Sequence, residues 1–416
     1  MAHINDLPHE ILLKIFSEYL KTESQLSLIQ NVSKTCLYWS EVCMDAFLWC
    51  IYDGSLPFVT LKQFCKKGYL KNIEILNFSK VKENVNVTQE DLKSIYSNLP
   101  KVKCVIFSNA VKKFEKRECY LISELQKHCP NLNEIIINEQ TFHDYKISNK
   151  LFENFFDFRG SKLVSLDFSN INLVGVRDLF LTIASSCRNL EHLKVQNLHI
   201  QSANPSFLIE NMQEGLQKLK TLRLGYPILF RSRSSLKSCG FPTLEIFTHP
   251  SKMDCYIQDR LLKRLLLKSP NLKVLDIRGC TLLTADALCA LPAADLERLY
   301  VSQTRLYSSL NFINVLRKWG HSLEALDISR LKGSIINDHF TSLISNCNLQ
   351  NLEILDINNT AVTISTVKMI IRNCPKLNFL QLESCRELCR GCKRAYEGKI
   401  SIEELLLKLD DNMDIT

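Results

Sequence analysis

The stretch LKVLDIRGCTLLTADAL, residues 272–288, contains the pattern that organises most of this chain. Its apolar residues Leu272, Leu275 and Ile277 are spaced L-x-x-L-x-L. Because alternate residues of a strand point to the same side, the second and third of these side chains share one buried face. The stretch therefore predicts a short strand with one face in a core.

The same pattern returns along the chain from residue 73 onward, at intervals of 24 to 31 residues. Its copies begin at Ile73, Val102, Leu132, Leu163, Leu190, Leu219, Leu244, Leu272, Leu296, Leu323, Leu352 and Leu377. Between copies lie segments such as RDLFLTIASSC, residues 177–187, whose apolar spacing of three and four is helical. A strand and a helix of this size bury their apolar faces only by stacking on neighbouring copies. We therefore predict an α/β fold, a curved solenoid of about twelve strand-helix repeats with a parallel concave sheet.

Composition narrows the class of protein. The chain has 416 residues, of which 46% are hydrophobic, and a net charge of +8. Residues 1–52 hold 3 Lys and 6 Asp or Glu, so this region is acidic and the remainder carries +11. The basic residues are scattered, and we expect no nucleic-acid partner. The N-terminus MAHINDLPHE lacks a secretory signal, and no apolar run approaches the ~18 residues of a membrane span. We expect no membrane partner, a cytoplasmic or nuclear location, and reduced cysteines.

The N-terminal region predicts three short helices. LPHEILLKIFSEYL, residues 7–20, forms the first, since Pro8 suits a helix's first turn and the apolar residues fall in two adjacent columns. Thr22 to Gln25 resembles a capping box that opens the second helix, and the third passes through Trp39. Helices this short share little core, so we expect some apolar side chains to stay exposed until a partner covers them. A helical cap on the open end of the solenoid is the alternative.

Two resemblances follow from these residues. The order LPxExLxxIFxxxL, Cys-x-x-Trp and Asp-x-x-Leu-Trp within residues 7–49 resembles the F-box, although Thr35 and Leu37-Tyr38 depart from its pattern. The repeats resemble leucine-rich repeats of the cysteine-containing type, with Cys280 in the place of the ladder residue. Together they are similar to the F-box/leucine-rich-repeat family. The tail RGCKRAYEG, residues 390–398, also resembles the end of the branch called F-box/LRR-repeat protein 6.

The family resemblance implies a function. The F-box would bind the Skp adaptor of an SCF ubiquitin ligase, and through it a cullin, while the concave face would bind a protein substrate for ubiquitination and degradation. The chain would be a non-catalytic receptor without a cofactor. An adaptor-bound scaffold that acts without cullin is the alternative. The implied adaptor-binding residues are Leu7, Pro8, Ile11, Leu12, Ile15, Phe16, Leu20, Trp39, Leu48 and Trp49.

The concave face suggests the chemistry of a substrate. The third, fifth and seventh residues of each copy face that side of the sheet. Its middle is basic and partly aromatic, between flanks of Asp at the fifth position. This pattern favours a partner segment with acidic groups. The candidate substrate-binding residues are His192, Lys194, Arg223, Arg278, Arg298 and Tyr300.

The C-terminal region offers one further candidate chemistry. Cys385, Cys389 and Cys392 include a CxxC, but no fourth ligand follows, so we expect no metal and keep a thiol or zinc enzyme as the remote alternative. Beyond them, Ile402, Leu405, Leu406 and Leu409 share a helix face that suits a closing cap; a tail along the concave surface is the other possibility.

These patterns together predict the domain organisation. We expect an F-box at 1–52, a linker at 53–70, the solenoid at 71–385 and a cap or tail helix at 386–416.

Overall fold

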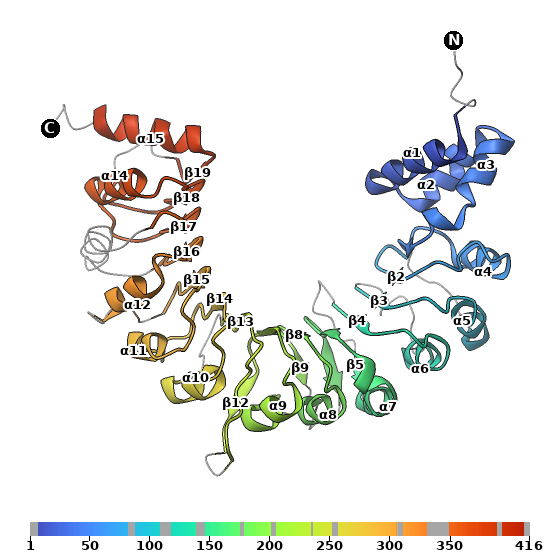
Figure 1. Cartoon of the computed structure of the whole chain (residues 1–416), viewed down its shortest axis with the longest axis horizontal. Helices are drawn as coiled ribbons and strands as arrows, with labels where there is room; N and C mark the ends of the chain where they lie inside the picture. The colour runs from blue at the N-terminus through green and yellow to red at the C-terminus, as the bar shows by residue number, and fades with distance from the viewer. Residues whose placement is uncertain are drawn as a thin grey trace. The chain divides into compact units, whose positions relative to one another are not determined.

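The computed structural model describes residues 7–81, 88–108, 118–138, 146–174, 179–200, 205–233, 236–251, 257–304, 306, 311–330, 349–388 and 393–411. The chain divides into two compact units, Met1–Ala203 and Asn204–Thr416. In each unit, strands line one side and helices the other (Figure 1). Strands are spaced about 4.8 Å apart, whereas packed helices need about 8–10 Å, so each unit curves toward its sheet.

The first unit begins with a cluster of short helices. They are α1 (His9–Thr22), α2 (Gln25–Gln30), the 3-10 turn η2 (Val32–Lys34), α3 (Leu37–Cys43) and the 3-10 turn η3 (Ala46–Leu48). The three predicted helices are present, but the predicted capping box is wrong. Helix α1 continues through Thr22, and Ser24 caps α2 by accepting a hydrogen bond from the Ser27 amide.

The strand-helix repeats of the first unit follow directly after the N-terminal helices. The sheet of this unit runs in the order β1 (Ile51–Tyr52), β2 (Ile75–Asn77), β3 (Cys104–Ile106), β4 (Glu134–Ile136), β6 (Ser165–Asp167) and β8 (His192–Val195), with all neighbours parallel. Its helices are α4 (Phe58–Lys66), α5 (Gln89–Tyr96), α6 (Glu118–His128), α7 (Asn149–Arg159) and α8 (Leu179–Ser186), with the 3-10 turn η5 (Gly160–Lys162) after α7. A small sheet of β5 (Lys146–Ser148), β7 (Asn172–Val174) and β9 (His199–Ile200) lies beside them.

Residues 53–70 are not a linker. They contain α4, which packs on α5, and the strand before it, β1, pairs with β2. Gln25 at the start of α2 donates its side-chain amide to the Ile51 carbonyl and its backbone N–H to Asp53. Trp49 packs edge-on against Phe64 of α4, with ring centroids 5.7 Å apart. The helical cluster and the first repeat thus form one hydrogen-bonded body, because Ile51-Tyr52 makes a repeat strand that the leucine pattern does not mark.

The second unit continues the repeats. Its strands run in the order β11 (Thr221–Leu224), β13 (Ile246–Thr248), β14 (Val274–Asp276), β15 (Arg298–Tyr300), β16 (Ala325–Asp327), β17 (Ile354–Asp356), β18 (Phe379–Gln381) and β19 (Ala395–Glu397). Only the β18–β19 pair is antiparallel among those described here. The helices are α9 (Ile209–Gly215), α10 (Asp259–Leu266), α11 (Ala285–Cys289), α12 (Phe312–Trp319), α14 (Ile364–Asn373) and α15 (Lys399–Asp411), and β10 (Ser206–Leu208) pairs with β12 (Leu229–Arg231).

All twelve predicted strands are therefore present, and the predicted solenoid is confirmed. The eighth residue of several copies has positive φ, and asparagine, which tolerates that conformation, occupies it at Asn170, Asn197 and Asn359. Gly279 takes the same place in the copy that begins at Leu272. The next residue, Cys280, is buried with its thiol against the His249 carbonyl of the preceding repeat, as a ladder residue should be.

A second ladder precedes the strands. The asparagine just before the first apolar residue of a copy donates its side-chain amide to a carbonyl of the preceding repeat. The pairs are Asn72 to Ala46, Asn131 to Pro100, Asn189 to Ser161, Asn271 to Pro242 and Asn351 to His321. These contacts lie at the helix-to-strand turn, so they link successive repeats where the strand ladder has not yet begun.

The C-terminal helix closes the array. In α15, Ile402, Leu405 and Leu409 are buried, and the helix packs on α14. Asp410 receives Lys368 at 2.8 Å and Arg372 at 3.1 Å from α14. The described residues therefore form a cap on the last repeat and not a tail along the open face of the sheet.

Candidate functional site

The N-terminal helices divide their apolar side chains between core and surface. Four of the predicted adaptor-binding residues, Leu12, Phe16, Leu48 and Trp49, are buried in this chain's own core. Trp49 also donates its indole N–H to the Cys43 carbonyl at 2.9 Å. These four residues hold the helices together and offer almost no surface in this conformation, so their direct contact with an adaptor stays a prediction.

The remaining predicted residues reach the surface to different degrees. Ile11 and Ile15 are 40% and 41% exposed and lie one turn apart on α1. Pro8 is exposed as well, whereas Leu7 and Leu20 are half-buried. Trp39 is also half-buried, packing edge-on to Phe16 at 5.3 Å. The apolar surface on α1 is therefore narrower than the sequence pattern indicates.

Two exposed apolar residues were missing from the predicted set. Leu37, at the start of α3, is 86% exposed, and Phe47, in η3, is 61% exposed. The Tyr38 hydroxyl donates to the Leu7 carbonyl at 3.3 Å, and His9 contacts Asp45 at 3.0 Å, so the starts of α3 and η3 lie beside the start of α1. The backbone N–H of Phe47 and the His9 ring lower the pKa of Asp45. We call Ile11, Ile15, Leu37 and Phe47 the apolar patch.

The open face of the sheet differs from the predicted charge pattern. Asp167, Asp276 and Asp327 at fifth positions are buried. Each accepts a backbone N–H two residues further on; Asp167 does so from Ser169 at 3.0 Å. These carboxylates terminate their strands, so they are not acidic flanks open to a ligand. Asp356 makes the same contact, and burial raises its pKa.

The predicted basic residues are not equivalent. In the first unit, His192 and Lys194 are half-buried on β8, and Lys194 pairs in register with Asp167. In the second unit, Arg278 binds Asp276 through two hydrogen bonds of 2.9 and 2.7 Å and lies 5.4 Å from the ring centroid of Tyr300. Arg298 is exposed, 4.0 Å from Glu324. Arg223 on β11 is half-buried.

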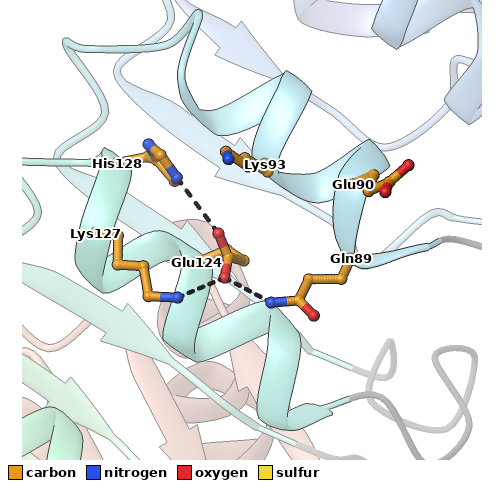
Figure 2. Close-up of a pocket in the computed structure, with 6 residues that line it drawn as sticks. All are labelled: Gln89, Glu90, Lys93, Glu124, Lys127 and His128. Atoms are coloured by element: carbon orange, nitrogen blue, oxygen red, sulfur yellow. Dashed lines mark hydrogen bonds and ion pairs between the residues drawn. The ribbon is translucent and has the colours of Figure 1, made fainter.

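A pocket on the helix side involves residues that no sequence motif indicated. It has a volume of about 430 Å³ and is lined by Gln89, Glu90 and Lys93 of α5 and by Glu124, Lys127 and His128 of α6. Lys127, Gln89 and His128 lie around the carboxylate of Glu124 (Figure 2). Their nitrogens are 2.8, 3.0 and 3.3 Å from its oxygens, respectively. Burial opposes ionisation of Glu124, but the hydrogen bonds from Lys127 and Gln89 outweigh it and lower its pKa. These contacts account for the buried carboxylate as a link between neighbouring helices.

Most of the described cysteines are buried in the core. Cys129, Cys187 and Cys374 are buried, and burial raises the pKa of each thiol to about 12. Cys385 is buried, with its thiol 3.2 Å from the Ile357 carbonyl. Cys389 and Cys392 lie outside the described residues. Within those residues, no cluster of three His, Cys, Asp or Glu has the arrangement of a metal site.

Comparisons with known proteins address the N-terminal helices and the fold. Residues 4–50 match the family model F-box-like. The chain therefore has an F-box-like domain at its N-terminus. No curated protein matches the sequence significantly. None of the described helices combines the length and apolar composition needed to span a bilayer.

Solved structures resemble the whole chain in fold. A chain in the crystal structure of the Rad7 and Elc1 complex in yeast matches 92% of this chain and 90% of its own length, with 16% identity and a TM-score of 0.50. A chain in the crystal structure of the mouse RP105/MD-1 complex matches 89% of this chain and 63% of its own length, with 14% identity and a TM-score of 0.48. The first likeness agrees with the solenoid described above and concerns the fold alone.

Proposed function

We propose that this chain is the substrate-recognition subunit of an SCF ubiquitin ligase that works in the cytoplasm or the nucleus. The F-box-like domain would bind the Skp adaptor and, through it, a cullin. The open face of the sheet would hold a protein substrate for ubiquitination and proteasomal degradation. The observation that carries the proposal is the coincidence of the F-box-like match at residues 4–50 with the exposed apolar patch.

The size of the patch suits a partner. Burying an aliphatic or aromatic side chain contributes about 1.5–3 kcal/mol. Ile11 and Ile15 are already more than half covered, so most of the gain would come from Leu37 and Phe47. Together with a polar rim, such a patch can offset the cost of association, which is about 4–15 kcal/mol. It follows that Leu37 and Phe47, and not the buried Trp49, are the residues whose substitution tests adaptor binding.

The experiment is co-purification of the chain with the Skp adaptor from co-expressing cells. We expect L37E and F47E each to reduce adaptor recovery at least tenfold, since a carboxylate would be buried without a partner. The matched control is L407E on α15, where Leu407 is exposed to a similar degree, at 66%, far along the chain. If L37E and F47E retain adaptor as well as L407E does, the patch is not the adaptor site.

The role of cullin needs a separate measurement. Co-precipitation of cullin with the wild-type chain and its adaptor is expected, together with loss of cullin in L37E. Adaptor binding without any cullin would favour the alternative of a scaffold. The resemblance of the tail to one branch of the F-box/LRR family rests on residues 390–398, of which 393–398 are described.

A further inference from the structure

Two polar groups on the open face of the second unit have no hydrogen-bond partner among the described residues. The guanidinium Nε of Arg223 and the hydroxyl of Thr248 are each buried, and neither makes a hydrogen bond within the part of the chain that the structure describes. Arg223 and Thr248 occupy partner positions on the adjacent parallel strands β11 and β13. Because Leu222 and Phe247 point into the core, both polar side chains lie on the opposite, open face of the sheet.

The neighbouring arginines on this face are already paired with acidic side chains. Arg278 is held by Asp276 through two hydrogen bonds and by the ring of Tyr300. Arg298 lies beside Glu324. No acidic side chain among the described residues forms an ion pair with Arg223, which sets Arg223 apart from the other two predicted arginines of this unit.

Two buried polar groups without hydrogen-bond partners destabilise the folded chain unless a bound group supplies those partners. A buried donor without an acceptor destabilises a protein, and buried polar groups in folded proteins are nearly always satisfied. Thr248 is only 6% exposed, so bulk water reaches its hydroxyl poorly. Arg223 and Thr248 are register partners on neighbouring strands, which lie about 4.8 Å apart, so both side chains can donate to one oxyanion bound between them.

We propose that Arg223 and Thr248 form an anion subsite for a carboxylate or phosphate group carried by a bound protein segment. The inference rests on the proposed function, since it names the chemistry of the segment that the open face would hold. The guanidinium N–H groups donate to the oxyanion, and the Thr248 hydroxyl rotates to donate to a second oxygen.

Surrounding residues suit the same ligand. Asp276, on the strand next to Thr248, would repel an anion, but Arg278 neutralises it. The third positions of β13 and β14, Ile246 and Val274, are half-buried and pair in register beside the polar row. An acidic or phosphorylated residue flanked by an apolar residue therefore fits this part of the sheet.

The test measures binding of the full chain, with its adaptor, to three degenerate peptide pools of equal length. Their fixed central residue is glutamate, phosphoserine or lysine. We expect the wild-type chain to bind at least one anionic pool about tenfold more tightly than the lysine pool. Equal binding of both anionic pools identifies carboxylate as sufficient, whereas preference for phosphoserine identifies phosphate as the ligand.

Variants separate the subsite from general charge attraction. R223Q should abolish the preference for anions and T248V should weaken it, while R372Q, which removes a paired, exposed arginine from helix α14 of the same unit, should leave it intact. R223M should not lower the melting temperature, because it removes an unsatisfied group. The proposal is overturned if wild-type protein shows no anion preference, if R223Q keeps it, if R372Q loses it equally, or if R223M unfolds the protein. Adaptor recovery, measured on the same samples, reports separately on the proposed function.

Discussion

Replacing Gly279 by alanine adds only one methyl group, but it should destabilise the chain more than a change of that size usually does. Gly279 has a φ of +75°, which costs an L-residue about 1–2 kcal/mol. A Cβ there would also lie 2.9 Å from the Ser251 carbonyl carbon and closer still to its oxygen. Hydrogen bonds hold the backbone on both sides: the Gly279 N–H donates to Ser302, and the Arg278 carbonyl accepts from Ser251.

The backbone cannot move without breaking one of those bonds, so overpacking adds about 1–3 kcal/mol. We expect G279A to lose about 3–4 kcal/mol in total, and its melting temperature to fall by roughly 10 °C. Gly398 supplies a matched control, because its φ is +82° but a Cβ added there would meet no atom within 4 Å. G398A should lose only the conformational part, about 1–2 kcal/mol.

Thermal unfolding followed by circular dichroism measures both variants. Equal losses in G279A and G398A would refute the steric contribution and show that the turn relaxes around the new methyl group. Because Gly279 follows Arg278, G279A should also disturb the Arg278–Asp276 pair beside the proposed anion subsite. Weaker binding of the preferred anionic pool, in protein that is still folded at the assay temperature, would support that link.

Three further outcomes can be checked. The pKa of Glu124 is lowered from its ordinary 4.5, so its ionised form contributes stability above that pH, and the contribution is lost as pH falls through the lower folded value. As the pH falls below 4.5, stability should therefore decrease more steeply in wild type than in E124Q, and parallel pH profiles would contradict this. H249L should raise stability by about 1 kcal/mol in thermal unfolding, because the buried His249 Nδ1 has no hydrogen-bond partner among the described residues and the other copies have an apolar residue at that core position; a lower melting temperature would argue against it. N271A removes the side-chain bond to Pro242 and should cost about 1 kcal/mol, whereas exposed K268A should be neutral; equal effects would remove the role of the asparagine ladder.

Much of the fold could be predicted because leucine spacing reports directly on burial. Leu275 and Ile277 lie on one face of their strand, and all twelve copies of the pattern form strands, including the copy at Leu244. The strand Ile51–Tyr52 was missed, since two residues show no periodicity. Residues 53–70 consequently looked like a linker although α4 lies within them.

The binding surfaces were harder to predict. On α1, the apolar columns of Leu12 and Ile11 look alike in sequence, but neighbouring helices cover only the first. Leu37 drew attention only as a departure from the family pattern, yet it is the most exposed large apolar residue among those described. The sequence also did not show that Arg278 is paired with an acidic residue and Arg223 is not, because pairing depends on which side chains become neighbours in the fold. A signal was available for the buried aspartates: each stands two residues before the backbone N–H that it binds.

The bonds from Gln25 to Ile51 and Asp53 determine how a docked adaptor would be presented. A flexible tether would let the adaptor sample many orientations, and the second binding event would depend on tether length. With β1 paired to β2 instead, an adaptor on the apolar patch would keep one fixed direction relative to the first strands of the sheet. Substrate lysines would then be selected by their position on the bound protein, since reach could not be extended by loosening this junction.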